Sequence, residues 1–157
     1  MDISPSHEDA RTEASRLPAL YASLALLQQT DPQATAVATI EIYGTPRPPA
    51  GDPSGGAPIV VIEMTSSAGA IDDELIELSI DTPISAQITG ADETDGTIPI
   101  WARIKTPDSS WWSDVSVTVE GSGGELEMPQ TGTEDGSPVA RLFNGATAMI
   151  SSAVIRG

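Results

Sequence analysis

The sequence predicts a mainly β fold, a single antiparallel β-sandwich preceded by one N-terminal α-helix. Short runs of alternating apolar and polar residues fill the C-terminal half, and Gly, Pro and Asp turns cut them into strand-sized pieces. Helical spacing of apolar residues is confined to the region near the N-terminus. Strand order is not encoded in these patterns, so an immunoglobulin-like sandwich and a jelly roll both remain open.

The predicted helix spans residues 16–29. Its apolar stripe, at spacings of three and four residues, consists of Leu17, Leu20, Tyr21, Leu24 and Leu27. Pro18 fits the first turn, where a missing N–H costs nothing, and Asp31-Pro32 ends the helix. Upstream, Ser6 is expected to cap a separate short helical turn.

This stripe has two interpretations. An amphipathic helix usually packs on its own domain, whereas a terminal helix leading a β domain also serves as an arm that packs on a neighbouring subunit. The expected organisation is an N-terminal helical arm at residues 1–34 and a β-sandwich domain at residues 35–157.

Nine runs are expected to form strands: 35–43, 59–64, 75–80, 80–88, 98–105, 111–120, 125–128, 139–143 and 146–155. The run 59–64 is continuously apolar, which predicts a strand buried on both faces in the centre of its sheet. Pro99 predicts that the strand at 98–105 starts on an edge. Residues 44–56 are rich in Pro and Gly and predict a surface loop, and 121–124 predict a hairpin connection.

The charge disfavours some partners. With 23 acidic and 7 basic residues the formal net charge is −16, and such a chain repels phosphate backbones, so no nucleic-acid partner is expected. No run approaches the ~20 apolar residues of a membrane span. The charged N-terminal residues do not follow the order of a cleaved signal peptide. We therefore expect a soluble protein with no membrane partner.

The sequence holds little catalytic chemistry. His7 is the only histidine and there is no cysteine, so neither a catalytic triad nor a His/Cys metal site is expected, and we predict no enzyme activity and no cofactor. The acidic segments 72–74 and 92–96 leave a Ca²⁺ site open, although neither has EF-hand spacing. A carboxylate-pair glycosidase would need a sugar cleft lined with aromatic side chains, and only six aromatic residues are present.

Protein–protein contact is the chemistry that the remaining residues favour. Adjacent strand residues face opposite sides, so one ring of the pair Trp111–Trp112 is expected in the core and the other toward solvent or a partner. Positive charge is scarce, so Arg47, Arg103 and Arg141 either anchor an interface or balance a nearby carboxylate. The candidate interface residues are Leu17, Leu20, Tyr21, Leu24, Leu27, Arg47, Trp111 and Trp112.

Five segments resemble small virion proteins of tailed bacteriophages. They are GTIPIWARI at 96–104, WWSDVSV at 111–117, GSGGEL at 121–126, FNGATAMI at 143–150 and, upstream, ATIEIYGTPRP at 38–48. Together these segments span most of residues 36–155. The resemblance implies a non-enzymatic structural component of the virion, assembled in the host cytoplasm and present in several copies or as a homo-oligomer.

Within that class, the first expectation is a capsid decoration or cement protein that binds the outer surface of the major capsid protein shell, because an acidic outward face tolerates solvent. The N-terminal helix and the loop 44–56 would grip neighbouring subunits. A neck, tail or baseplate protein is the alternative. A carbohydrate-binding β-sandwich module that stacks a sugar on Trp111 or Trp112 is the expectation from a different class.

Overall fold

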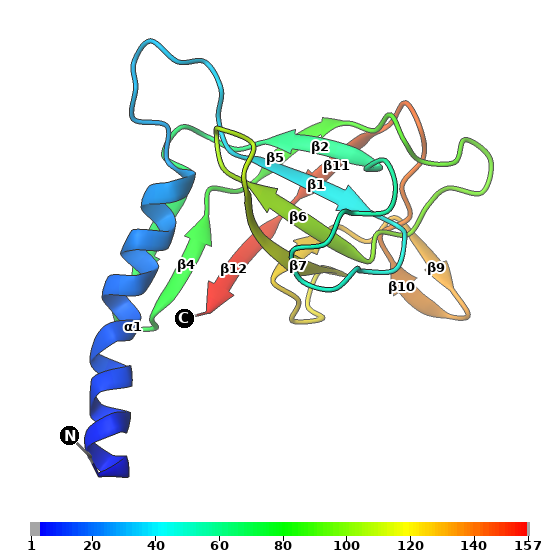
Figure 1. Cartoon of the computed structure of the whole chain (residues 1–157). Coiled ribbons are helices and arrows are strands. Elements are labelled where there is room, and N and C mark those ends of the chain that lie inside the picture. The colour runs from blue at the N-terminus through cyan, green and yellow to red at the C-terminus, as the bar shows by residue number, and fades with distance from the viewer. Residues whose placement is uncertain (1–3, 157) are drawn as a thin grey trace.

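The computed structural model describes residues 4–156. The protein is mainly β, with 36% of residues in strands and 15% in one N-terminal helix, and its strands form a large curled sheet (Figure 1). The predicted fold class is therefore confirmed at the level of a β protein with an N-terminal helix. The single antiparallel sandwich is not confirmed.

Helix α1 runs from Pro5 to Leu27, eleven residues further toward the N-terminus than predicted. Its N-cap is Ser4 rather than Ser6: the Ser4 hydroxyl accepts a hydrogen bond from the backbone N–H of His7 at 3.3 Å, and Pro5 occupies the first turn. Pro18 consequently lies inside the helix. Because proline there removes only one backbone hydrogen bond, the helix continues through it once the following turns are held by packing.

The two halves of α1 have different surroundings. Residues 4–15 are all exposed, and Figure 1 shows this part of the helix extending beyond the β body. In the second half, Leu20, Leu24 and Leu27 are buried in the same core as the sheet, and Leu17 is half-buried. The division into an arm at 1–34 and a domain at 35–157 stays a prediction, but the core crosses that boundary.

Eight strands form the main sheet, in the order β2-β1-β6-β7-β8-β12-β4-β3. They are β1 (Thr39–Tyr43), β2 (Val60–Glu63), β3 (Gly69–Asp72), β4 (Glu77–Ile80), β6 (Trp101–Lys105), β7 (Trp111–Val119), β8 (Leu126–Met128) and β12 (Ser152–Arg156). Two further pairs complete the fold: β5 (Ile84–Gln87) with β11 (Thr147–Ile150), and the hairpin of β9 (Gly132–Glu134) with β10 (Ser137–Val139).

The curl arises at two bends. The chain bends at Pro83 between β4 and β5, which lie in the successive predicted runs 75–80 and 80–88, and the single predicted run 146–155 divides at Ser151 into β11 and β12. Since β4 pairs with β12 and β5 pairs with β11, the two segments bend at the same place in the sheet. The backbone N–H groups of Thr89 and Gly90 then donate to the carbonyl of Ile59, just before β2. One core lies inside this curled sheet.

Three strand predictions are wrong. The apolar run at β2 forms an edge strand rather than a central one, and its Val61 is 44% exposed. β6 lies in the interior between β1 and β7 and not on an edge. Pro99 is compatible with this position, because it precedes the strand, which begins at Trp101, and need not donate to the ladder. Residues 139–143 form no continuous strand: Val139 ends β10, and Leu142 makes an isolated bridge to Thr97.

The connection between β7 and β8 is not the predicted hairpin, because these two strands are parallel. Val117 pairs with Leu126, so the short loop after β7 must carry the chain back along the strand before β8 begins. Gly121 and Gly123 have φ values of +80° and +78°, a backbone conformation that favours glycine and allows this tight reversal.

The packing of α1 makes a prediction about two leucines two positions apart. Leu24→Ala should lower the free energy of unfolding by about 2–5 kcal/mol, because it leaves a cavity between helix and sheet. Leu26→Ala, at a position 61% exposed, should change it by less than about 0.5 kcal/mol. Urea unfolding of both variants measures the difference, and equal effects would contradict the placement of α1.

Candidate interaction surface

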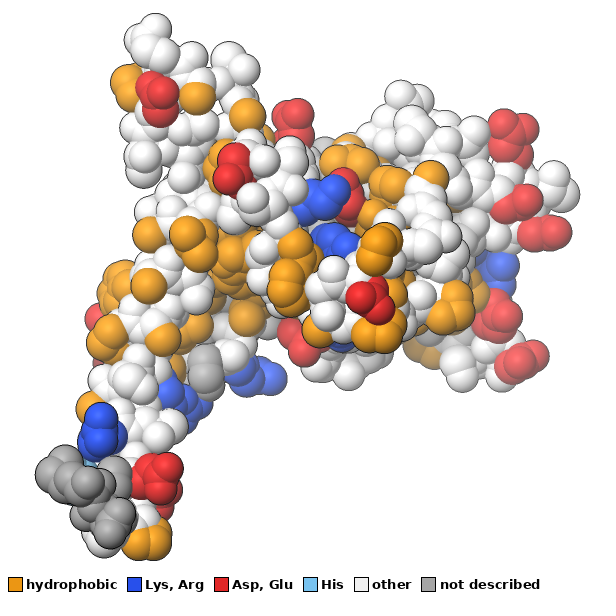
Figure 2. All heavy atoms as spheres, in the orientation of Figure 1, with side chains coloured by type: hydrophobic (Ala, Val, Ile, Leu, Met, Phe, Trp, Pro, Cys, Tyr) orange, Lys and Arg blue, Asp and Glu red, His pale blue; other side chains and the backbone are white. Residues whose placement is uncertain are grey.

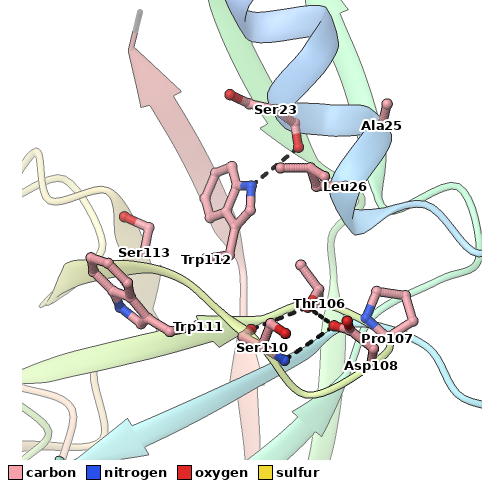
Figure 3. A pocket seen from close by; sticks show the side chains of 10 residues that line it. All are labelled: Ser23, Ala25, Leu26, Thr106, Pro107, Asp108, Ser110, Trp111, Trp112 and Ser113. Carbon is pink, nitrogen blue, oxygen red and sulfur yellow. Dashed lines mark hydrogen bonds between the residues drawn. The ribbon is translucent and has the colours of Figure 1, made fainter. Parts of the chain in front are cut away.

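A groove runs between the second half of α1 and the end of the β6–β7 hairpin (Figure 3). One hollow of about 780 Å³ lies between Leu26 of the helix and the 106–113 segment, and a second of about 350 Å³ continues toward Ile155 of β12. Both hollows are lined by Ser23 and Trp112. We call the two together the α1–β7 groove.

A β-bulge orients the two tryptophans beside this groove. Ile104 pairs with Ser113 but Lys105 pairs with Trp111, so Trp112 is an extra residue in β7. In a regular strand, residues 111 and 114 would face opposite sides of the sheet. Because of the bulge they share one face, and the indole N–H of Trp111 donates to Oδ1 of Asp114 at 3.1 Å.

Trp112 holds the helix against the sheet. Its indole N–H donates to the backbone carbonyl of Ser23 at 3.1 Å, and its ring packs against the core as a half-buried side chain (Figure 3). Trp111 points away from the helix and is 47% exposed. The expectation that one ring faces the core and the other solvent therefore fits, with Trp111 as the exposed ring.

The outer face of α1 is uncovered along the groove. Residues 17–27 contain no charged side chain, so this segment is apolar on all sides, which is typical of a helix that is buried all round. Only one side, with Leu20, Leu24 and Leu27, is buried. Tyr21 and Leu26 are 50% and 61% exposed.

Under the exposed Trp111 lies a buried ion pair. Arg103 of β6 and Asp114 of β7 form a two-pronged contact at 2.7 and 2.8 Å, and both residues are 7% exposed. Burial by itself raises the pKa of Asp114, but the hydrogen bonds from Arg103 and Trp111 and the positive charge of Arg103 outweigh it, so the pKa lies below its ordinary value. The carboxylate is thus ionised at neutral pH and fixes the indole of Trp111.

The proline-rich loop 44–56 folds back over this face and is not a free arm. The Thr45 carbonyl accepts from the Trp101 indole at 2.8 Å, and the Arg47 guanidinium donates to the Asp114 carbonyl at 2.5 Å. Beneath it the rings of Tyr43 and Trp101 stack with centroids 4.4 Å apart. Arg47 is exposed, but its guanidinium is used within the chain.

Charge is distributed unevenly between helix and body. Residues 5–27 carry three acidic and two basic side chains. Residues 28–157 carry nineteen acidic and five basic side chains. Arg16 and Arg156 line the lower end of the groove, where they pair with Glu13 at 3.0 Å and Glu77 at 2.8 Å. In Figure 2 apolar side chains gather where the helix meets the body, and acidic ones gather at the opposite end.

The other predicted site residues are accounted for within the chain. Leu20, Leu24 and Leu27 belong to the core, and the Tyr21 hydroxyl donates to Asp73 at 2.8 Å. Arg141 donates to the carbonyl of Asp95 and pairs with Glu134. His7 lies exposed in the first turns of α1.

Residues 4–156 contain no group of three or more His, Asp or Glu side chains arranged to hold a metal ion. Within the same range, no helix combines the length and apolar character that crossing a membrane requires. Comparison with protein-family models, curated proteins and solved structures finds no match to this chain.

The sequence alone did not reveal three features of the surface. The bulge at Trp112 and the pairing of Arg103 with Asp114 depend on strand register, which no local pattern specifies. Leu26 was missed because it does not belong to the apolar stripe of α1, whose residues are spaced three and four positions apart. The uncharged run 17–27 was the available signal, since a helix that is apolar all round needs a second partner surface.

The buried ion pair gives a prediction for stability. Asp114→Asn should lower the free energy of unfolding at pH 7 by about 3–5 kcal/mol, because it leaves Arg103 buried without its anionic partner. Glu134→Gln, which breaks the exposed pair with Arg141, should cost less than about 1 kcal/mol.

The pH dependence of this loss has a definite sign. Since the pKa of Asp114 is lowered in the folded state, its stabilising effect is complete above the unfolded pKa of about 3.9 and disappears as the pH falls through the lower folded value. The stability gap between wild type and Asp114→Asn should therefore narrow below about pH 4. A constant gap from pH 7 to pH 2 would contradict this account.

Proposed function

We propose that this protein is a non-enzymatic assembly component that docks on a partner protein through α1 and the α1–β7 groove. The observation that carries the proposal is the helix itself. Its residues 4–15 are all exposed and none of them lies in the core, although an isolated helical segment of this length is marginal in water. A partner that packs along the segment would supply the missing contacts.

The groove extends this surface along the rest of the helix. Leu26 and Trp111 present apolar side chains beside it, and Trp is enriched at the centres of protein interfaces. The net negative charge resides almost wholly on the β body, so α1 approaches a partner with little electrostatic repulsion. The interface candidates that support the proposal are therefore Leu17, Tyr21, Leu26 and Trp111.

The setting we propose is a tailed-phage particle, with the major capsid protein shell as the partner and decoration of its outer surface as the role. This part rests on the sequence resemblance. A position in the neck, tail or baseplate is the alternative within the same class. In either position the protein would be a virion component present in several copies.

Removal of residues 2–15 tests the docking proposal. The truncation ends before Leu17, because a longer one would take Leu20 and Leu24 out of the core and unfold the chain. The truncated protein should keep its thermal midpoint within a few degrees and lose cosedimentation with capsid shells that lack the protein. Full-length protein should saturate such shells, and its copy number per particle separates decoration from a neck or tail position.

Pro18→Ala serves as the matched control, since it keeps the whole helix and should bind shells at least as well as wild type. Undiminished binding of the truncated protein would refute the role of the arm.

The carbohydrate-binding alternative predicts a different response. One exposed indole, Trp111, remains available to stack on a sugar, because Trp112 is held against the helix. A module of that kind should show a saturable change in tryptophan fluorescence with oligosaccharides that Trp111→Ala abolishes. We expect no such change, and a saturable one would replace the docking proposal.

A further inference from the structure

The main sheet has a gap between β7 and β12. Strand β8 lies between these two strands, parallel to β7 and antiparallel to β12, but it pairs only with residues 117–119 and 152–153. Among the described residues, no strand pairs with the same side of β7 at residues 111–116. A hollow of about 360 Å³ lies there, with residues 113–115 on one wall and 154–156 on the other. We call this hollow the β7–β12 notch.

The chain itself leaves the notch just before β8. An added Cβ at Gly124 would lie 2.5 Å from Oγ1 of Thr118, so the chain there lies against a side chain of β7 instead of continuing along its edge. Glu125 takes over one function of the missing strand, because its Oε2 accepts from the backbone N–H of Ser116 at 2.8 Å. A side chain thus replaces the backbone carbonyl that a longer β8 would supply.

Backbone groups on both walls point into the notch. The N–H of Asp114 points to the same side as that of Ser116, because residues two apart in a strand direct their backbone groups alike. On β12, the Val154 N–H donates to the Glu125 carbonyl at 2.9 Å, so the N–H of Arg156 also points this way. Within residues 4–156, neither the Asp114 N–H nor the Arg156 N–H has a hydrogen-bond partner. Unpaired strand edges of this kind are where an extended segment of another chain adds to a sheet.

The inner side of the notch is apolar. Leu126 of β8 lies between its pairing partners Val117 and Ala153 and is fully buried. Two residues further back along the same line, the flanking residues are Val115 and Ile155, which face the same core. An extended segment in this line would place one apolar side chain between them.

We propose that the β7–β12 notch takes an extended segment of the partner protein, which adds a strand to the sheet in line with β8. The segment carries an apolar side chain at its inward position and polar side chains next to it, as the alternation of a strand requires. β8 shows what fits, because it is seated between the same two strands. Two strands with a third between them lie about 9.5 Å apart, which is too narrow for a helix of about 10–12 Å in diameter.

This inference rests on the proposed function, because the segment belongs to the partner on which α1 docks. Ile155 and Arg156 line both the notch and the smaller hollow of the α1–β7 groove. β12 ends beside α1 (Figure 1). A partner packed along the helix therefore reaches the notch with a neighbouring segment.

Arg156→Pro tests the notch in the complex with capsid shells that lack the protein. Proline removes the N–H that faces the notch, and this N–H is not used in the pairing with β4, so the fold should persist. Arg156→Ala is the matched control, since it removes the same side chain and its ion pair with Glu77 but keeps the N–H. In cosedimentation, Arg156→Pro should bind at least about tenfold more weakly than Arg156→Ala. Equal binding of the two variants would overturn the proposal.

A tethered strand tests the notch without shells. The segment Thr-Val-Thr-Val-Thr, joined after Gly157 by a flexible Gly-Ser linker, is held near the notch at about millimolar effective concentration. It should shift the amide NMR signals of Asp114 and Arg156 and slow their hydrogen exchange. The same extension with Thr-Pro-Thr-Pro-Thr should leave both signals unchanged, since proline does not fit between two paired strands.

The outcomes separate this inference from the proposed function. Unchanged amide signals in the chain with the tethered strand would overturn the notch. If the truncation of residues 2–15 still abolishes shell binding in that case, the proposed function stands. A wild type that does not bind shells would overturn the proposed function and, with it, the assignment of the segment to that partner.

Discussion

The burial of Leu20, Leu24 and Leu27 against the curled sheet is the contact on which the rest of the surface depends. These three side chains fix one side of α1, and the hydrogen bond from Trp112 to the Ser23 carbonyl fixes its distance from β7. The α1–β7 groove is the space left between α1 and β7. Without this packing, the exposed face of α1 would have no defined neighbour and residues 4–15 would have no rigid base from which to extend.

The second constraint is the ion pair of Arg103 and Asp114, which organises the outer face of β1, β6 and β7. A buried pair of this kind contributes little net stability by itself, but it leaves a large penalty when one partner is removed. The carboxylate of Asp114 also accepts from the Trp111 indole, and the backbone carbonyl of Asp114 accepts from the Arg47 guanidinium of the proline-rich loop. That loop is thereby held on its own sheet, and the helix remains as the element that extends from the body.

The β class and the N-terminal helix could be predicted from the sequence because alternation and helical spacing are local signals. Edges, register and curvature could not. The apolar run at β2 resembled a central strand, yet Val61 is exposed on an edge, because periodicity does not report which neighbours a strand has. The start of α1 was missed because Pro18 suggested a first turn. The identity of the exposed indole followed only from the bulge at Trp112, a register feature.

The central claim is that the first half of α1 is reserved for a partner, and hydrogen–deuterium exchange of its backbone amides tests it most directly. In the isolated protein, amides of residues 6–15 should exchange nearly as fast as in an unstructured peptide, while those of residues 20–27 are protected by the core. On assembled capsid shells the first group should become protected. Exchange at residues 6–15 that is unchanged by assembly would contradict the account.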